Sequence, residues 1–513
     1  MASLLRQYVG VVAPDWPDWA VNTFLGLSVS CMALVGGQNL SQRGQLKQTQ
    51  TRVNGGNGSA KGQAKAFKRF QVKYLSVYFV VMLADWLQGT NMYTLYQSYG
   101  VDVGLLFLTG FSSAAVFGTF LGLFVDKFGR RAGCMVFCVL ELVINLLEHF
   151  PSMGLLITGR ILGGISTSLL FSAFESWMVS EHRKKGFPEE LLESTFSLAT
   201  VGNGIMAVLA GVAAQISADA LGDIGPFQVA IALTALALAL LFSWEENYGH
   251  ESHGNTGPKV AAAGDSKGNG HSNGAANGHA NGHSSGDGAD GSGSSKRGLG
   301  ESVSLAVRCI TSDPRVLLLG LVQSLFEGGM YTFVFMWVPT MQGVVPGGNL
   351  PTGLVFSAFM VCVAMGGLLF SQMLRCLTVE MASAAVFLLA AIAMAMPVVA
   401  AHDFTTVLGS FLVLETCVGA FYSCSGLMRS KYLPDDLQSS IMNLFRLPLN
   451  LLVVVGTRLT DVAAPATVFL VVSLWFAATA ALQLRLCAVQ AQWGEGSPGH
   501  TAAAATNGKG KKD

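Results

Sequence analysis

The sequence predicts an all-helical membrane protein that has two halves of six spanning helices each and one additional N-terminal helix. Three observations support this fold class. Of the 513 residues, 51% are hydrophobic and only 12% are charged, whereas soluble chains carry about 25% charged residues. Apolar runs of spanning length come in two sets of six, separated by a polar segment. Basic residues fall almost entirely into alternate loops, as the positive-inside rule requires.

A spanning helix needs about 20 mostly apolar residues, and twelve core runs meet this requirement. The first six begin near Lys73, Val103, Ala132, Met153, Thr195 and Pro226. The second six begin near Arg315, Thr352, Thr378, Thr405, Ser439 and Ala466. We therefore assign residues 73–244 to an N-terminal half and residues 301–488 to a C-terminal half.

The segment between the halves, residues 245–300, is rich in Gly, Asn, Ser and His and includes 268-GNGHSNGAANGHANGHSSGDG-288. Such a composition cannot bury a core, so we expect a disordered linker, and a similar disordered tail over residues 489–513. The linker histidines could bind a metal weakly, but we favour a low-complexity spacer. The nine cysteines form no CxxC pair. We therefore predict no metal site, no disulfide framework and no cofactor.

One more apolar run, 20-AVNTFLGLSVSCMALVG-36, precedes the core. Its length is at the short limit for a span. A cleaved signal peptide is the alternative, but the residues before the run include Asp15 and Asp18 and are not clearly basic. We favour an additional helix at about residues 20–36, followed by a cytosolic segment that completes an N-terminal region of residues 1–72.

The distribution of basic residues predicts the orientation of the core. Lys and Arg cluster before the first core helix, in the 2–3, 4–5, 8–9 and 10–11 loops and in the tail, whereas the loops on the other side have none. Only Arg458, near the end of the eleventh helix, breaks this pattern. We therefore expect both ends of the core and the linker to be cytosolic, with the protein in the plasma membrane.

The stretch 122-GLFVDKFGRR-131 stands between the second and third core helices and fits GxxxD[RK]xG[RK][RK] at every specified position. Its candidate gating residues are Gly122, Asp126, Gly129, Arg130 and Arg131. The glycines permit close helix approach and a tight turn. The aspartate can cap a helix or pair with a cation, and the arginines anchor the cytosolic side. We expect Glu175, at the cytosolic end of the fourth helix, to pair with Arg130 in the same gate.

This motif resembles the signature loop of the major facilitator superfamily, whose two six-helix halves are related by a pseudo-repeat. The matching triplets 92-MYT-94 and 330-MYT-332 fall where such a repeat requires them. Further stretches narrow the resemblance: 85-DWLQG-89, 93-YTLYQSYG-100, 159-GRILGGISTSLLFSAFESW-177, 244-WEENYG-249, 314-PRVLLLGLVQSLFE-327 and 443-NLFRLPLN-450. Together they resemble the molybdate-anion transporter branch over about residues 66–488. The resemblance implies uptake of the molybdate oxyanion by alternating access.

Ionisable residues at membrane depth are functional candidates. Those predicted inside the spans are Asp85, Glu141, Glu327 and Glu415 near the midplane, Arg160 in the outer half and Arg446 in the inner half. A guanidinium fork suits a tetrahedral oxyanion, so Arg446 is predicted to bind substrate or, alternatively, to form a structural pair with Glu415 or Glu327. Arg160 is expected to pair with Glu141 or to take part in coupling.

Asp85 would repel a dianion if it were ionised, and burial favours its protonated form. Proton binding by Asp85 or Glu327 would therefore couple anion entry to protons; a permanent pair of Asp85 with an arginine is the alternative. Neutral donors to the substrate are predicted at Gln88, Asn91 and Tyr93, with Ser172 and Asn203 as further candidates.

The leading interpretation is a secondary transporter of molybdate whose partners are the anion, the bilayer and protons, and which works as a monomer. The sequence leaves open a carrier for another solute, such as sulfate, a sugar or an organic acid, and a transport-inactive sensor. No basic domain indicates nucleic-acid binding, and no GxSxG, HExxH or P-loop motif indicates an enzyme.

Overall fold

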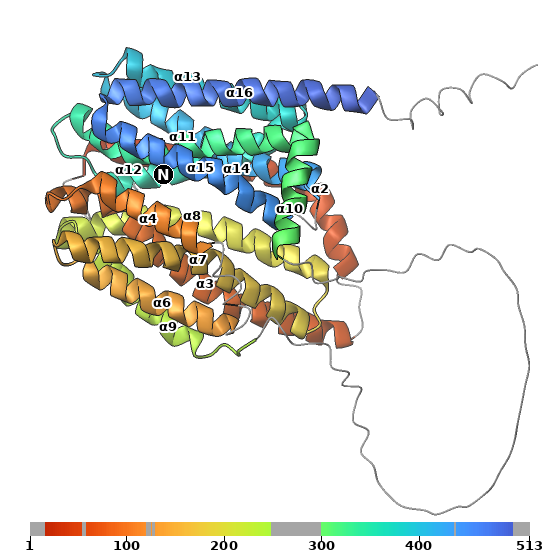
Figure 1. Cartoon of the computed structure of the whole chain (residues 1–513). Coiled ribbons are helices and arrows are strands. Elements are labelled where there is room, and N and C mark those ends of the chain that lie inside the picture. The colour runs from red at the N-terminus through yellow and green to blue at the C-terminus, as the bar shows by residue number, and fades with distance from the viewer. Residues whose placement is uncertain are drawn as a thin grey trace, which may run out of the picture.

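The computed structural model describes residues 16–53, 58–118, 125, 129–247, 299–434 and 438–495. Within these residues every extended regular element is an α-helix (Figure 1). Nine of the described helices have a length and composition suited to crossing a membrane, and two shorter apolar helices accompany them. The all-helical membrane fold predicted from the sequence is confirmed.

Each of the twelve predicted core runs falls on one helix. The first half contains α3 (Gly58–Ser98), α4 (Val103–Gly118), α6 (Arg130–Leu147), α7 (Met153–Lys184), α8 (Glu189–Leu221) and α9 (Gly225–Leu241). The second half contains α11 (Pro314–Val344), α12 (Thr352–Met373), α13 (Val379–Val399), α14 (Phe404–Tyr432), α15 (Gln438–Val462) and α16 (Pro465–Glu495). Side chains cap the N-termini of several of these helices. Asp313, Thr378 and Asp403 accept hydrogen bonds from backbone amides in the first turns of α11, α13 and α14.

The two halves lie against each other, with the first half below the second in Figure 1. Arg130 and Arg131 begin α6, and Arg183 and Lys184 end α7. We call the end of the bundle that carries these residues the basic end, and the other end the opposite end. Contacts between the halves run mainly through α8 with α12 and through α4 with α15.

The α8–α12 contact lies near the opposite end and brings the two backbones very close. A Cβ atom on Gly211 would lie 2.5 Å from the carbonyl oxygen of Gly353, and only glycine permits this approach. The Ser357 hydroxyl donates to the Val208 carbonyl oxygen over 2.9 Å. The Gly353 amide donates to Gln215 Oε1 over 3.0 Å. The halves are therefore joined tightly here.

Aromatic rings close the contact of α4 with the second half. Phe107 and Phe111, in the first turns of α4, lie with ring centroids 5.0 and 5.7 Å from that of Phe335 on α11. The Phe111 ring also meets Tyr331 edge-on at 5.1 Å. At the basic end, by contrast, the first half carries a cavity of about 430 Å³. The structure therefore describes a conformation whose halves are packed together near the opposite end.

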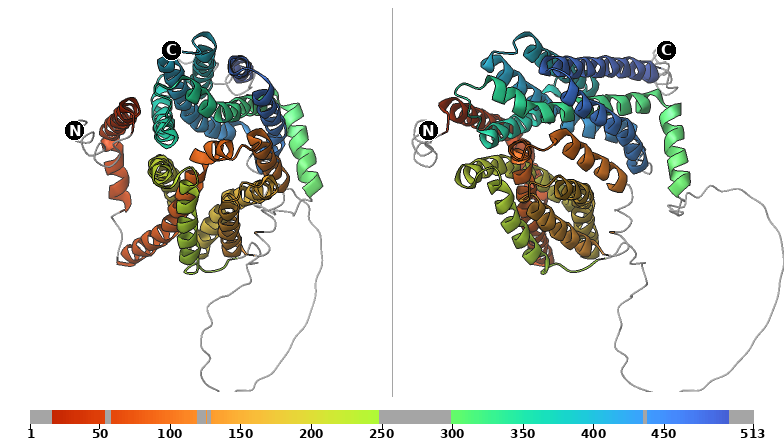
Figure 2. Two further views of the ribbon diagram at one scale, coloured as in Figure 1. Left: turned by 90° about the vertical axis from the view of Figure 1, so that its left-hand side faces the viewer. Right: turned by 60° about the vertical axis from the view of Figure 1, so that its left-hand side comes forward.

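Two helices lie outside the twelve. Helix α2 (Asp18–Val53) contains the predicted run 20–36 but is longer than predicted, and it packs against α12. Helix α10 (Leu299–Ser312) runs across the ends of the spans and contacts α11 and α15 (Figures 1 and 2).

The predicted linker and tail lie mostly outside the described residues, but their inner edges were assigned wrongly. Residues 245–247 fold back onto the first half, because the Trp177 indole and the Arg130 amide bond their carbonyl oxygens. Helix α16 continues to Glu495. Apolar and hydrogen-bonding contacts outweigh the polar composition at these edges.

Candidate functional site

The described part of the signature loop, Gly129–Arg131, is held by Glu246. The Glu246 carboxylate accepts hydrogen bonds from the Arg131 amide at 2.8 Å and the Ala132 amide at 2.9 Å, and so it caps the N-terminus of α6. Gly129 has φ +113°, and a Cβ there would lie 2.6 Å from Glu246 Cδ. The loop glycine is therefore required both by its backbone and by the capping carboxylate. Gly122 and Asp126 lie outside the described residues.

The segment that carries Glu246 is fixed by aromatic packing. The Trp244 ring stacks on Trp177 of α7 with centroids 3.7 Å apart. The Trp177 indole donates to the Glu245 carbonyl oxygen over 2.8 Å. The end of α9 therefore ties α6 to α7 beside the loop, and the gating motif is part of a network that includes residues distant in sequence.

Glu246→Ala should lower the free energy of unfolding by about 1–2 kcal/mol, because it removes a charged cap from two helix amides. Glu245→Ala is the matched control, since the structure uses only the backbone carbonyl of that residue in the tie to Trp177. Thermal unfolding of the purified protein in detergent measures the difference. Equal melting temperatures for the two variants would contradict the capping role.

Arg130 and Glu175 line the basic-end cavity together, as the gate prediction requires of them. The cavity is lined by Arg130, Ser172, Glu175, Ser176, Val179, Ser180 and Arg183 among the described residues. The Ser172 hydroxyl donates to the Ser168 carbonyl oxygen within α7. The direct pairing of Arg130 with Glu175 stays a prediction.

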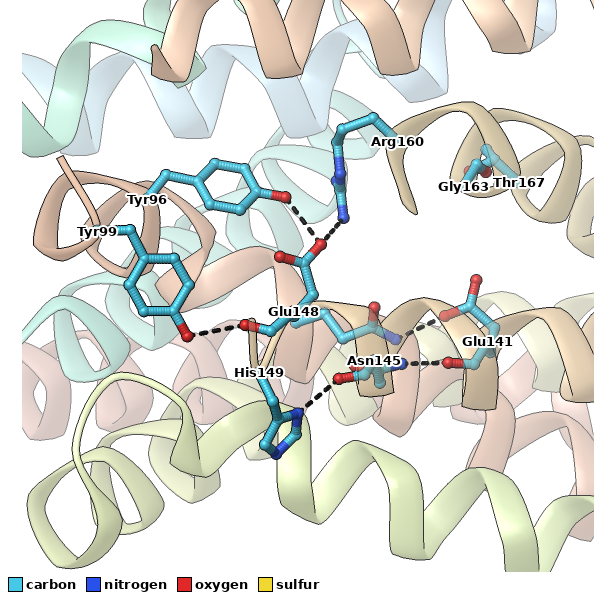
Figure 3. A network of polar contacts seen from close by, with 10 residues as sticks. Tyr96, Tyr99, Glu141, Asn145, Glu148, His149, Arg160, Gly163 and Thr167 are labelled. Atoms are coloured by element: carbon cyan, nitrogen blue, oxygen red, sulfur yellow. Dashed lines mark hydrogen bonds and ion pairs between the residues drawn. The ribbon is translucent and has the colours of Figure 1, made fainter. Parts of the chain in front are cut away.

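Two buried carboxylates, Glu141 on α6 and Glu148 directly after its last residue, organise the polar interior of the first half (Figure 3). Glu141 Oε2 accepts from Gln88 of α3 over 2.8 Å, and Glu141 Oε1 accepts from Ser166 of α7 over 2.5 Å. Each oxygen of the Glu141 carboxylate therefore has a side-chain donor. Gln88, predicted as a donor to the substrate, is therefore occupied by Glu141 in this conformation.

Glu148, two turns further along the chain, is paired with Arg160. Arg160 donates to Glu148 Oε1 over 2.6 Å, and the Tyr96 hydroxyl donates to the same oxygen over 2.8 Å (Figure 3). The side chains of Glu148 and Arg160 are only 1% and 13% exposed. The prediction that Arg160 pairs with Glu141 is therefore wrong, because the short α6–α7 connection places Glu148 beside Arg160.

Asp85 lies on α3 near Glu141, so that their negative charges repel each other when both are ionised. Within the described residues the structure shows no ion pair of Asp85 with an arginine. Nearby, Asn91 is buried and accepts from the Thr90 hydroxyl over 3.0 Å. Tyr93 packs against the core of the second half. Asp85 therefore differs from Glu141, whose carboxylate accepts two side-chain hydrogen bonds.

In the second half, helices α11 and α15 approach closely where Glu327 and Arg446 lie. A Cβ on Gly320 would come within 2.3 Å of the Phe445 ring, and the Ser324 hydroxyl donates to the Phe445 carbonyl oxygen over 3.1 Å. Arg446 follows Phe445 directly, and Glu327 lies less than one turn beyond Ser324. This packing brings Arg446 to the same region as Glu327.

Helix α14 adds a second guanidinium to that region. The Phe421 ring stacks on Phe326 with centroids 4.2 Å apart, and Tyr422 bonds Met330 Sδ over 3.5 Å. Arg429 lies two turns nearer the basic end than Tyr422. Arg429 and Arg446 are thus the guanidinium groups nearest in sequence to the contacts of α14 and α15 with the α11 segment that carries Glu327. We call Glu327, Tyr331, Arg429 and Arg446 the second-half cluster.

Two further candidates lie apart from this cluster. Glu415 is buried on α14, where its charge acts on Cys362 and Tyr422, and the structure favours Glu327 over Glu415 as the neighbour of Arg446. Asn203 on α8 accepts from the Trp86 indole over 2.8 Å and holds α3 to α8. Its role is therefore structural in this conformation.

Sequence reasoning missed Glu148, Glu246 and Arg429. Glu148 stands at the end of an apolar run, beside a short loop, and symmetry about that loop places Arg160 opposite Glu141 instead, so the sequence pattern did not indicate the pair. Glu246 was assigned to the linker. Arg429 was assigned to the 10–11 loop, because the apolar run ends before it, although helix α14 continues to Tyr432.

The helix arrangement is that of known transporters. A crystal structure of a point mutant of the nucleoside transporter NupG covers 81% of this chain and 99% of that chain, with a TM-score of 0.60 at 11% identity. The POT family transporter PepTSo covers 82% and 98%, with a TM-score of 0.57 at 10% identity. These likenesses show that the chain has the fold of this class of membrane proteins.

Sequence comparison narrows this class. A family model described as sugar transporters with 12 transmembrane segments matches residues 46–262 and 283–421. A molybdate-anion transporter of Xenopus tropicalis is 32% identical over 418 residues, which are 76% of this chain and 79% of that protein. A molybdate-anion transporter of Takifugu rubripes is 33% identical with the same coverage. The chain belongs to the molybdate-anion transporter family of the major facilitator superfamily.

Proposed function

We propose that this protein carries molybdate across the plasma membrane by alternating access, as a monomer with its basic end in the cytosol. The observation that carries the proposal is the close approach of α11 and α15, which brings Arg446 to the region of Glu327, with Arg429 on the neighbouring α14. Relatives named as molybdate-anion transporters support the choice of anion.

The charge balance of the cluster suits a dianion. Arg429 and Arg446 carry two positive charges against the one negative charge of Glu327. A tetrahedral oxyanion offers several acceptor oxygens, and guanidinium forks bind such oxygens with charge-assisted hydrogen bonds. Tyr331, one turn beyond Glu327 on α11, is a suitable neutral donor. Protonation of Glu327 would leave two positive charges for the two negative charges of molybdate.

Asp85 is the carboxylate best suited to bind a coupling proton in the first half. Glu141 accepts hydrogen bonds from Gln88 and Ser166, and Glu148 is paired with Arg160. Asp85 faces the charge of Glu141 without such support. A proton that enters the first half is therefore held most favourably at Asp85, where it relieves repulsion between two carboxylates and between Asp85 and the dianion.

A sugar carrier is the competing function, because the matching family model is described by sugar transport. Sugar sites rely on neutral hydrogen-bonding groups and stacking aromatics. The second-half cluster instead concentrates charge, and the ring of its tyrosine, Tyr331, already packs edge-on against Phe111 at 5.1 Å. The arrangement therefore favours an anionic solute.

Uptake of labelled molybdate, with sulfate and glucose as competitors, tests this function in cells that lack their own carrier. We expect molybdate accumulation that excess glucose leaves unchanged. Competition by sulfate measures selectivity, since the two anions share charge and shape. Glucose accumulation without molybdate uptake would establish the competing function instead.

The orientation has its own test. A tag inserted near Ser285, in the linker between the halves, should be reached by antibody only after the membrane is permeabilised, because basic residues flank the cytosolic side. A tag in the loop after Ser98, which lies at the opposite end, is the control and should be reached on intact cells. Labelling of the Ser285 tag on intact cells would reverse the orientation.

Asp85→Asn should flatten the pH dependence of molybdate uptake. Wild-type uptake should fall as the pH rises from about 5 to 8, because a desolvated carboxyl loses its proton over this range and then repels the anion. The asparagine variant mimics the protonated acid at every pH. Asp102→Asn is the matched control, since Asp102 only caps α4 by accepting from the Leu105 amide and asparagine caps as well. If Asp85→Asn kept the wild-type pH profile at equal surface expression, Asp85 would not be the group that couples uptake to protons.

A further inference from the structure

The beginning of α2 is anchored to the second half at the opposite end. Trp19, Ala20 and Val21 pack with Leu354 in the first turn of α12. The Trp19 ring also meets the ring of Phe404, at the start of α14, edge-on at 4.7 Å. Further along, Gln38 donates to the Leu368 carbonyl oxygen over 2.9 Å. Helix α2 is thus attached along α12 and belongs structurally to the second half.

Trp16, which lies two residues before the start of α2, contacts the first half. The Trp16 indole Nε1 donates to Asp219 Oδ2, near the end of α8, over 2.7 Å. The other oxygen, Asp219 Oδ1, accepts from Gln215 Nε2 over 2.8 Å. Gln215 Oε1 in turn accepts from the Gly353 amide over 3.0 Å. An unbroken chain of hydrogen bonds therefore leads from α2 through α8 to α12.

Each link of this chain crosses or supports the contact between the halves. The Gly353 amide is one of the first-turn amides of α12 that have no partner within their own helix, and Gln215 satisfies it from the first half. Asp219 orients Gln215 for this bond. Trp16 holds Asp219 from the far side. Separation of α8 from α12 breaks both the Gln215–Gly353 bond and the Trp16–Asp219 bond, because Trp16 moves with the second half.

We propose that Trp16 and the start of α2 form a latch that holds the opposite end of the transporter closed. The latch stabilises the conformation in which α8 and α12 touch, and it must release for that end to open. It rests on the alternating access of the proposed function but not on the identity of the solute. The core helices alone provide the closed contact, and α2 sets how strongly that contact is favoured.

The test measures the distance across the opposite end without any molybdate present. Spin labels are attached at Ser98→Cys and Asn349→Cys, which are exposed positions on different halves. The accessible native cysteines are replaced by serine. The distance between the labels, measured by electron–electron double resonance, gives the closed and open populations. Trp16→Phe keeps an aromatic ring but removes the indole donor. We expect the ratio of open to closed populations to rise roughly threefold to tenfold, the effect of losing one such hydrogen bond. Trp475→Phe, on α16 of the second half, is the matched control and should leave the ratio unchanged.

Asp219→Ala removes the same bond from the other side. It should raise the open population as well, and the double variant should exceed Asp219→Ala by little, because the bond can be lost only once. Wild-type populations in Trp16→Phe, or additive effects in the double variant, would overturn the latch. If Trp16→Phe fails to fold, wild-type populations in Asp219→Ala overturn it alone. Loss of molybdate uptake has no bearing on this measurement, so a failure of the proposed substrate is distinguishable.

Discussion

Replacement of Arg446 by glutamine should weaken molybdate binding about tenfold or more. The guanidinium contributes charge-assisted hydrogen bonds to the anion, each worth about 1.5–3 kcal/mol, and about 1.4 kcal/mol corresponds to a factor of ten. Removal also leaves Glu327 with one cationic neighbour fewer, which increases the repulsion that the dianion meets. Equilibrium binding of molybdate to the purified variant measures the loss.

Two further variants separate charge from geometry at this position. Arg446→Lys keeps the positive charge but lacks the planar fork, so it should restore binding only in part. Arg458→Gln removes a guanidinium from the same helix, three turns nearer its end, and should leave binding within about a factor of two, because it lies far from the second-half cluster. Wild-type affinity in Arg446→Gln would assign Arg446 to structure instead of substrate.

Loss of Arg160 should be the most destabilising single change among the charged residues of the first half. Arg160→Met leaves the Glu148 carboxylate buried, with Tyr96 as its remaining side-chain donor. Breaking a buried pair from one side costs about 3–5 kcal/mol. The thermal unfolding temperature of the purified protein should fall accordingly.

Substitution of both partners of the Glu148–Arg160 pair tests whether the loss of stability comes from the unpaired charge. Glu148→Leu combined with Arg160→Met removes both charges and should recover much of the lost stability, since no isolated charge remains. Arg315→Gln is the control: its partner Asp313 is 22% exposed at the side chain, and pairs of that kind contribute about 0–1 kcal/mol. A double variant as unstable as Arg160→Met would show that packing, not charge pairing, sets the stability here.

The helices could be predicted from the sequence because each core run is longer and more apolar than any soluble element requires. The fold followed from their number and from the loop 122–131. The interior pairings could not be predicted, because they depend on how neighbouring helices rotate. The rotation of α6 about its axis places Glu141 beside Ser166 and Gln88. Arg160 bonds Glu148 instead.

The candidate site was predicted in part. Arg446 was identified from its depth and chemistry, and Glu327 was named as one of its two alternatives. Arg429 was missed, since a basic residue near the end of an apolar run also satisfies the positive-inside rule. The contacts of α2 with Asp219 and Leu354 connect residues far apart in sequence, and no local pattern in the chain indicates them.

Transport by the purified protein alone tests the central claim most directly. Proteoliposomes that contain the wild-type protein or Arg446→Gln, with an inwardly directed proton gradient, should be supplied with labelled molybdate. The account predicts molybdate accumulation by the wild-type protein, and little above empty vesicles by Arg446→Gln at the same protein content. Accumulation that is equal in the two preparations, or absent from the wild-type protein under all gradients, would contradict it.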